Sequence, residues 1–130
     1  MQLILDTNVY IFGFGLAKDT ACEELLLIIA ESSSLYILRI SRSIVKEVGH
    51  NLSLEDFQNF IRFITILTKI DEDFLVPFEL GAKYEAKGLK PADALIAAYT
   101  EWIGADVLIT ENRHFLSRQT DLPFKVLTAH

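Results

Sequence analysis

Short apolar runs alternate with longer amphipathic segments from one end of the chain to the other. Residues 2–5 form an apolar run that ends at Asp6, and this pattern predicts a buried β-strand. Further strands are predicted at residues 35–40, 106–110 and 124–127, and residues 68–70 are a candidate for another short one. The runs are apolar almost throughout, which is typical of parallel strands covered on both faces.

Between these runs, hydrophobic residues recur every three or four positions, which predicts amphipathic helices. Asp19, Ser41 or Ser43, and Ser53 are residue types that cap helix N-termini, and Pro91 suits the first position of a helix. The predicted helices cover residues 19–32, Ser41 or Ser43 to about residue 49 or 51, Ser53 to about residue 67, residues 73–87 and residues 92–103, with a helical turn at 112–118. The segment 92–103 is apolar nearly all round, so its helix is expected to be deeply buried.

The alternation of strands and helices favours an α/β architecture with a mainly parallel central sheet. A length of 130 residues fits one domain, residues 1–130. In such sheets, ligands bind in the crevice beyond the carboxyl ends of the strands. Candidate functional residues are therefore expected where strands end and helices begin.

Composition excludes several classes of protein. With 51% hydrophobic and 23% charged residues, the chain is too apolar to be disordered. Its single cysteine, Cys22, excludes a disulfide scaffold, and three scattered histidines provide no zinc-finger spacing. No apolar run approaches the length of a membrane span, and the N-terminus lacks the features of a signal peptide, so we expect a soluble, cytoplasmic protein without membrane contact. The net charge of −6 disfavours a broad electrostatic grip on nucleic acid but allows a small local site.

Oxygen-bearing side chains occur at strand exits and helix entries that lie far apart in the sequence. Asp6 ends the first strand, Glu47 lies early in the helix after the second, and Asp93 lies in the first turn of the helix that Pro91 opens. Glu111 and Asn112 directly follow the strand at 106–110. Strand exits and helix entries share one edge of a βαβ sheet, so convergence is expected, although the order of the strands is not readable from the sequence.

Each of these acids also has an ordinary structural interpretation. Asp93 is favoured by the helix dipole, Asp6 can cap a short helix from Thr7, and Glu47 and Glu111 can be solvated surface residues. Together, however, several carboxylates at one edge repel one another unless a cation neutralises them. Oxygen ligands without nearby His or Cys suit Mg²⁺ or Mn²⁺. In the absence of a phosphate-binding glycine loop, such a cluster suggests metal-assisted hydrolysis of a phosphodiester.

Four segments resemble the PIN-domain family: LILDTNV at residues 3–9, Glu47 within IVKEV, PADALIAA at 91–98 and LITENRHF at 108–115. Each motif is short, and their order and spacing carry the resemblance, which spans the whole chain. It implies a compact, PIN-like three-layer α/β/α fold with a mainly parallel central sheet, and an endoribonuclease activity that depends on Mg²⁺ or Mn²⁺. Small single-domain members are often the toxin of a VapBC-type toxin–antitoxin pair, which implies an antitoxin protein as partner.

By the same resemblance, Asp6, Glu47 and Asp93 form a metal-binding catalytic triad, and Asn8 and Thr110 orient it.

The family's fourth acidic position falls on Asn112, with Phe115 as the closing aromatic residue, so the chain departs from the family pattern there. Asn112 offers a carbonyl oxygen without charge, and the adjacent Glu111 is the alternative ligand. This departure leaves open a second function, in which a catalytically weakened PIN domain binds RNA or protein. A receiver-type phospho-acceptor domain is disfavoured. Its first strand would end in a pair of acids, whereas this one ends in a single acid, and no lysine stands directly before the last strand, which starts at Phe124.

Basic residues near the acids are candidates for contact with RNA phosphates, namely Arg42, Lys46 and Arg113. Lys83 and Lys87 share a helix with Glu79 and Glu85, which favours an ordinary solvated face. Nine phenylalanines in a chain of this size exceed what its core is expected to hide. We therefore expect a homodimer and a groove for an antitoxin helix.

Overall fold

The structure is a computed structural model of the 130-residue chain, and it describes residues 1–16, 18–32, 34–111 and 122–129. Within these ranges, five strands form one sheet in the order β3-β2-β1-β4-β5, and every neighbouring pair is parallel. The strands are β1 (Gln2–Leu5), β2 (Ile37–Ser41), β3 (Thr68–Asp71), β4 (Val107–Ile109) and β5 (Lys125–Leu127). The predicted parallel α/β architecture is confirmed.

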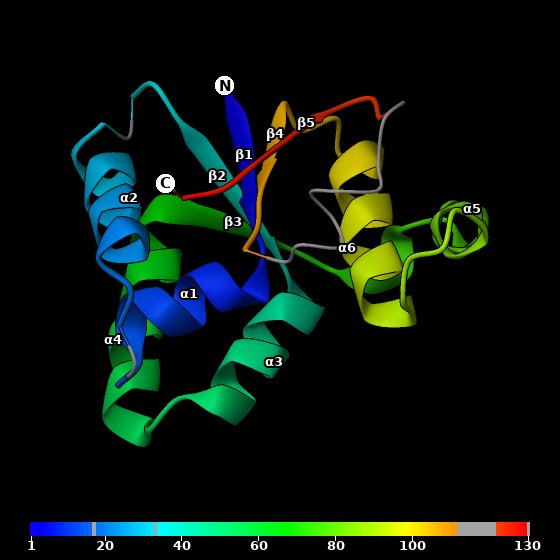
Figure 1. Cartoon of the computed structure of the whole chain (residues 1–130). Helices are drawn as coiled ribbons and strands as arrows, with labels where there is room; N and C mark the ends of the chain where they lie inside the picture. Colours follow the sequence, from blue (N-terminus) through cyan, green and yellow to red (C-terminus); the bar gives the residue numbers. More distant parts are fainter. Residues whose placement is uncertain (17, 33, 112–121, 130) are drawn as a thin grey trace.

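Helices cover both faces of the sheet. They are α1 (Thr7–Phe14), α2 (Thr20–Glu31), α3 (Arg42–Asn51), α4 (Leu54–Leu67), α5 (Phe78–Ala86) and α6 (Pro91–Trp102), with a short 3₁₀ turn at Asp73–Leu75. Figure 1 shows α1, α2 and α4 on one side of the sheet and α5 and α6 on the other, while α3 lies near the carboxyl ends of the strands. Among the described residues, no helix combines the length and the apolar character needed to cross a membrane.

The predicted helix starts coincide with side-chain caps. The carboxylate of Asp19 accepts hydrogen bonds from the backbone N–H groups of Ala21 and Cys22. The hydroxyl of Ser41, rather than that of Ser43, caps α3, and Ser53 caps α4. These local contacts satisfy N–H groups that the first helical turn leaves unpaired, so they are readable from sequence.

The single helix predicted at 73–87 is wrong at its start. The chain forms the 3₁₀ turn at Asp73–Leu75, and α5 begins only at Phe78. Pro77 explains the break, because proline restricts the preceding residue to extended conformations. Val76 accordingly has φ −75° and ψ 125°.

The core packs against both faces of the sheet. Tyr10 of α1 and Phe60 of α4 are fully buried, with ring centroids 5.1 Å apart in an edge-to-face arrangement. On the opposite face, residues 96–100 of α6 are buried without interruption. The expectation of a deeply buried helix is thus confirmed over its central turns, and α6 is held firmly against the sheet.

The sheet reverses its strand order at β1. From this central strand the chain continues to β2 and β3 on one side, and later to β4 and β5 on the other. Leu5 at the end of β1 is in register with Ile109 at the end of β4, and the N–H of Asp6 donates to the carbonyl oxygen of Ile109 at 2.9 Å. Such a reversal opens a crevice at the carboxyl ends of the two strands, and Asp6 and Thr110 lie at this position.

Candidate active site

Asp6 is a buried carboxylate between β1 and α1. Its residue is 5% exposed, and it occupies the N-cap position of α1. Oδ1 accepts a hydrogen bond from the backbone N–H of Thr7, and Oδ2 accepts one from the hydroxyl of Thr110, both at 2.7 Å. The backbone and a neighbouring strand therefore fix the orientation of this side chain.

The carboxylates of Asp93 and Glu47 lie close enough to Asp6 for their charges to act on its pKa. Burial raises the pKa of Asp6 above its ordinary value of 3.8, and the hydrogen bonds from Thr110 and Thr7 act in the opposite direction. The negative charges of Asp93 and Glu47 raise this pKa further. We call Asp6, Glu47 and Asp93 the acidic triad, in which the charges of the other two members act on Asp6.

Glu47 reaches the triad from α3, and its residue is exposed. Its Oε2 atom accepts a hydrogen bond from the hydroxyl of Thr7 at 3.2 Å. Thr7 therefore joins two acids, since its backbone N–H binds Asp6 and its hydroxyl binds Glu47. This role of Thr7 was not predicted; the signal for it in the sequence was its place directly after the acid that ends a strand.

Asp93 is placed by the start of α6. Pro91 is the first residue of the helix, as predicted. Asp93 follows in the same turn and is half-buried. This helix entry lies near the ends of β1 and β4, toward the lower edge of the sheet in Figure 1. A carboxylate is electrostatically favoured at this position by the helix dipole whether or not it has a further role.

The two predicted orienting residues differ in position. Thr110 is fully buried and contacts Asp6 directly. Asn8 is exposed in the first turn of α1, and the contact with the acids is made by its neighbour Thr7.

Of the predicted site residues around position 112, the structure describes only Glu111. Glu111 is half-buried, and its Oε1 atom accepts a hydrogen bond from the backbone N–H of Ala129 at 2.8 Å. This contact ties Glu111 to the segment after β5. Asn112, Arg113 and Phe115 lie outside the described residues, as does the predicted helical turn at 112–118.

The basic residues next to the triad are of two kinds. Arg42 pairs with Glu72, with 3.0 Å between Nη2 and Oε1, and its side chain is partly exposed. Lys46 is exposed on α3, one position before Glu47. The ion pair leaves Arg42 less available for a phosphate than the sequence suggests, whereas Lys46 remains at the surface beside the triad.

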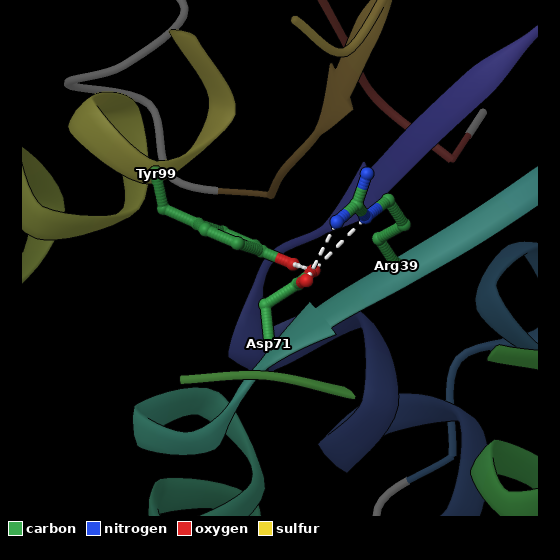
Figure 2. A network of polar contacts seen from close by, with 3 residues as sticks. All are labelled: Arg39, Asp71 and Tyr99. Carbon is green, nitrogen blue, oxygen red and sulfur yellow. Dashed lines mark hydrogen bonds and ion pairs between the residues drawn. The ribbon is translucent and has the colours of Figure 1, made fainter. Parts of the chain in front are cut away.

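A largely buried polar network joins β2, β3 and α6 and was not predicted. Figure 2 shows Arg39 of β2 and Tyr99 of α6 meeting at Asp71, the last residue of β3. Arg39 donates two hydrogen bonds to the carboxylate of Asp71, at 2.9 and 2.6 Å, and the hydroxyl of Tyr99 donates a third at 2.6 Å. Burial opposes the charge of Asp71, but these hydrogen bonds outweigh it and hold its pKa below the ordinary value. The network fastens α6, which carries Asp93, to two strands.

The donor chemistry of the triad fits a hard divalent cation. Its ligands are oxygen atoms only, and Mg²⁺ is typically held by one or two carboxylates together with waters and substrate phosphates. A cation would also offset the repulsion that raises the pKa of Asp6. Over the described parts of the chain, however, no three His, Cys, Asp or Glu side chains are grouped closely enough to hold a metal by themselves.

Comparisons with known proteins add the identity of the fold. No family model and no curated protein sequence matches the chain. A chain in the crystal structure of VapBC2 from Rickettsia felis, bound to a DNA fragment from their promoter, matches with a TM-score of 0.68 and 20% sequence identity, over 98% of this chain and 98% of that chain. This full-length match and the five-stranded parallel sheet show that the chain has a PIN-like α/β fold, as its motifs predicted.

Proposed function

We propose that this protein is an endoribonuclease that hydrolyses RNA phosphodiester bonds with the help of Mg²⁺ or Mn²⁺. The observation that carries the proposal is the buried carboxylate of Asp6, which is subject to the charges of Asp93 and Glu47 at the carboxyl ends of β1 and β4. Capping of α1 by Asp6 and the helix dipole at Asp93 favour each acid singly, but they do not offset the repulsion of Asp6 by the other two acids. The arrangement is explained if a divalent cation occupies the space between them.

In this proposal, Asp6, Glu47 and Asp93 hold the cation. When bound, the cation activates a water for attack on phosphorus and stabilises the leaving oxygen. Thr7 and Thr110 keep Asp6 in one orientation, and each engaged oxygen of Asp6 still has a second lone pair for a ligand. Thr7 also positions Glu47 through its hydroxyl.

Binding of the substrate phosphates needs positively charged side chains beside the triad, because the acids repel the phosphates. Lys46 is the described residue best suited to this contact, since it is exposed next to Glu47. Arg42 contributes if RNA displaces its partner Glu72, and the predicted contact by Arg113 remains part of the proposal.

The biological setting that we propose is a toxin–antitoxin pair, in the cytoplasm. A groove of about 350 Å³ lies between α1, α2 and α4, and its apolar lining suits a helix of an antitoxin protein. The lining residues include Gly13, Phe14, Leu26, Leu27, Ala30 and Phe63. A homodimer is proposed as well, since many large apolar side chains remain exposed on the single chain.

The second candidate is a PIN-like domain that binds RNA or protein with weakened catalysis. Two observations favour it: Asn112 carries no charge at the family's fourth acidic position, and the described residues do not group three potential metal ligands. This alternative predicts RNA binding without cleavage.

A cleavage assay separates the two candidates. Labelled single-stranded RNA is incubated with the protein in Mn²⁺, in Mg²⁺ and in a chelator. Cleavage should require the metal and disappear in Asp6→Asn and Asp93→Asn, while the exposed Glu55→Gln on α4 serves as the matched control. Binding of RNA with no cleavage in either metal would favour the binding module.

A further inference from the structure

An apolar groove runs between α5 and α6 on the side of the molecule opposite to the groove between α1, α2 and α4. Its volume is about 280 Å³. The residues from α6 recur every three or four positions and so share one face of the helix, and small residues on both helices keep the groove open. These small residues are Gly81, Ala82, Ala94 and Ala98.

Two aromatic side chains are exposed at this groove. Phe78, the first residue of α5, lines it and is 85% exposed, and Phe74 in the preceding 3₁₀ turn is 82% exposed. A phenylalanine ring that remains in water forgoes the free energy of burial. Two such rings close together in sequence indicate a surface that is covered during function.

The groove adjoins a smaller cavity that one member of the acidic triad lines. This cavity of about 60 Å³ lies between α3 and α6, and Glu47 lines it. Asp73 and Leu95 line both this cavity and the groove, so the two are neighbours. The groove therefore lies on the side of the molecule where a nucleotide next to a phosphate at the triad would be placed.

The charges around the groove decide which part of a nucleotide it suits. The ionisable residues that line it are Asp73 and Glu85, and both are acidic, so a phosphate is disfavoured there. A neutral aromatic base is favoured by the apolar walls and by an exposed ring on which to stack. The groove volume of about 280 Å³ lies just below the roughly 300–1,000 Å³ of cavities for drug-sized ligands, so the groove is large enough for a single base.

We infer that the groove between α5 and α6 binds one nucleobase of the RNA substrate, stacked on Phe78, next to the phosphate that is cleaved. This inference rests on the proposed ribonuclease function. It assigns to Phe78 a role in substrate affinity, and it places the base site next to the cavity that Glu47 lines.

The test measures the RNA affinity of Phe78→Ala. Its matched control is Ile66→Ala on α4, because Ile66 is 79% exposed and lies on the opposite face of the sheet. The probe is a labelled single-stranded RNA that the wild type cleaves, together with versions that carry one abasic site on either side of the cleaved bond. Phe78→Ala should raise KM roughly 5- to 100-fold, the usual loss for one stacked base. Ile66→Ala should leave KM unchanged, and Phe78→Trp should retain it.

The abasic probes make the test specific for stacking. At one position, removal of the base should weaken binding to the wild type by the same factor as Phe78→Ala. The same probe should lose nothing further with the variant, because the two changes remove one interaction. Independent, additive losses would overturn the inference.

The remaining outcomes are separable. If the wild type cleaves RNA and Phe78→Ala leaves KM unchanged, the base site is overturned while the proposed function stands. If the wild type neither binds nor cleaves RNA, the proposed function is overturned and the base site with it. If Phe78→Ala turns a dimer into a monomer by light scattering, the groove belongs to a second copy of the chain, which also overturns the inference. Phe78→Leu, which keeps an apolar side chain without a ring, provides a second variant if Phe78→Ala fails to fold.

Discussion

The hydroxyl of Thr110 donates a hydrogen bond to Oδ2 of Asp6 at 2.7 Å, although 104 residues separate the two in sequence. The contact arises because β1 and β4 are parallel neighbours whose last residues are in register. It gives a buried carboxylate a partner at the point where two strands end together. The candidate site is therefore a direct product of the strand order.

Asp6→Asn should abolish cleavage and stabilise the metal-free protein. Loss of a metal ligand should lower kcat at least about 100-fold. Because the pKa of Asp6 is raised in the fold, ionised Asp6 costs stability, and this cost appears as the pH rises from 3.8 through the raised pKa. Urea unfolding should thus show a gain for Asp6→Asn at pH 7 and none at a pH below 3.8. An unchanged cleavage rate would contradict the proposed mechanism.

Thr110→Val should affect both stability and activity. It leaves one oxygen of the buried Asp6 without its donor, at a cost of about 1–3 kcal/mol. We expect a roughly 10-fold lower kcat, since Asp6 is less well oriented. Thr100→Val is the matched control, because Thr100 is equally buried and its hydroxyl donates to the carbonyl oxygen of Ile96 in the same helix. An equal loss of kcat in the control would argue against an orienting role.

The network around Asp71 should dominate stability. Arg39→Met should destabilise the fold by about 3–5 kcal/mol, because it leaves a buried carboxylate without its cation. Tyr99→Phe should cost about 1.5–3 kcal/mol through the loss of one hydrogen bond to a charged group. Denaturant unfolding measures both values.

The same network has a definite pH dependence. The pKa of Asp71 is lowered in the fold, so its contribution is complete above the ordinary value of 3.8 and is lost as the pH falls through the lowered pKa. The double variant Arg39→Met with Asp71→Leu should recover much of the stability and lose this acid sensitivity. If the double variant still loses stability at low pH in the same range, a group other than Asp71 causes that loss.

Asn112→Asp should tighten the binding of a second metal ion and raise activity at low Mn²⁺, because ligand charge governs affinity for hard cations. Glu111→Gln should have the smaller effect, since the Glu111 carboxylate is bound to the backbone N–H of Ala129. Calorimetric titration of both variants with Mn²⁺ distinguishes them. Loss of metal binding in Glu111→Gln alone would identify Glu111 as the fourth ligand.

The free protein should be a homodimer in solution. Exposed apolar side chains such as Leu27, Ile28 and Leu54 exceed what a monomer of this size needs to leave in water. Light scattering at several protein concentrations measures the mass. A strictly monomeric mass at the highest concentration would contradict the prediction.

Much of the local structure was readable from sequence because its causes are local. Asp19, Ser41 and Ser53 cap helices through contacts within a few residues of themselves. The apolar runs predicted four of the five strands, since a strand covered on both faces needs such a run, and β3 (TKID) was only a candidate. The start of α5 differs from the prediction because Pro77 restricts Val76 to an extended conformation.

By itself, the sequence determined most of the elements, their α/β order and the placement of acids at strand exits and helix entries; it did not yield α1 as a predicted helix or the start of α5. The tertiary structure alone decided that β1 lies between β2 and β4, and thus that Thr110 meets Asp6 and that Thr7 joins Asp6 to Glu47. It also decided that Arg39, Asp71 and Tyr99 form one network. The physical reason is that hydrophobic periodicity and capping act over a few residues, whereas strand neighbours are chosen by the packing of the whole core.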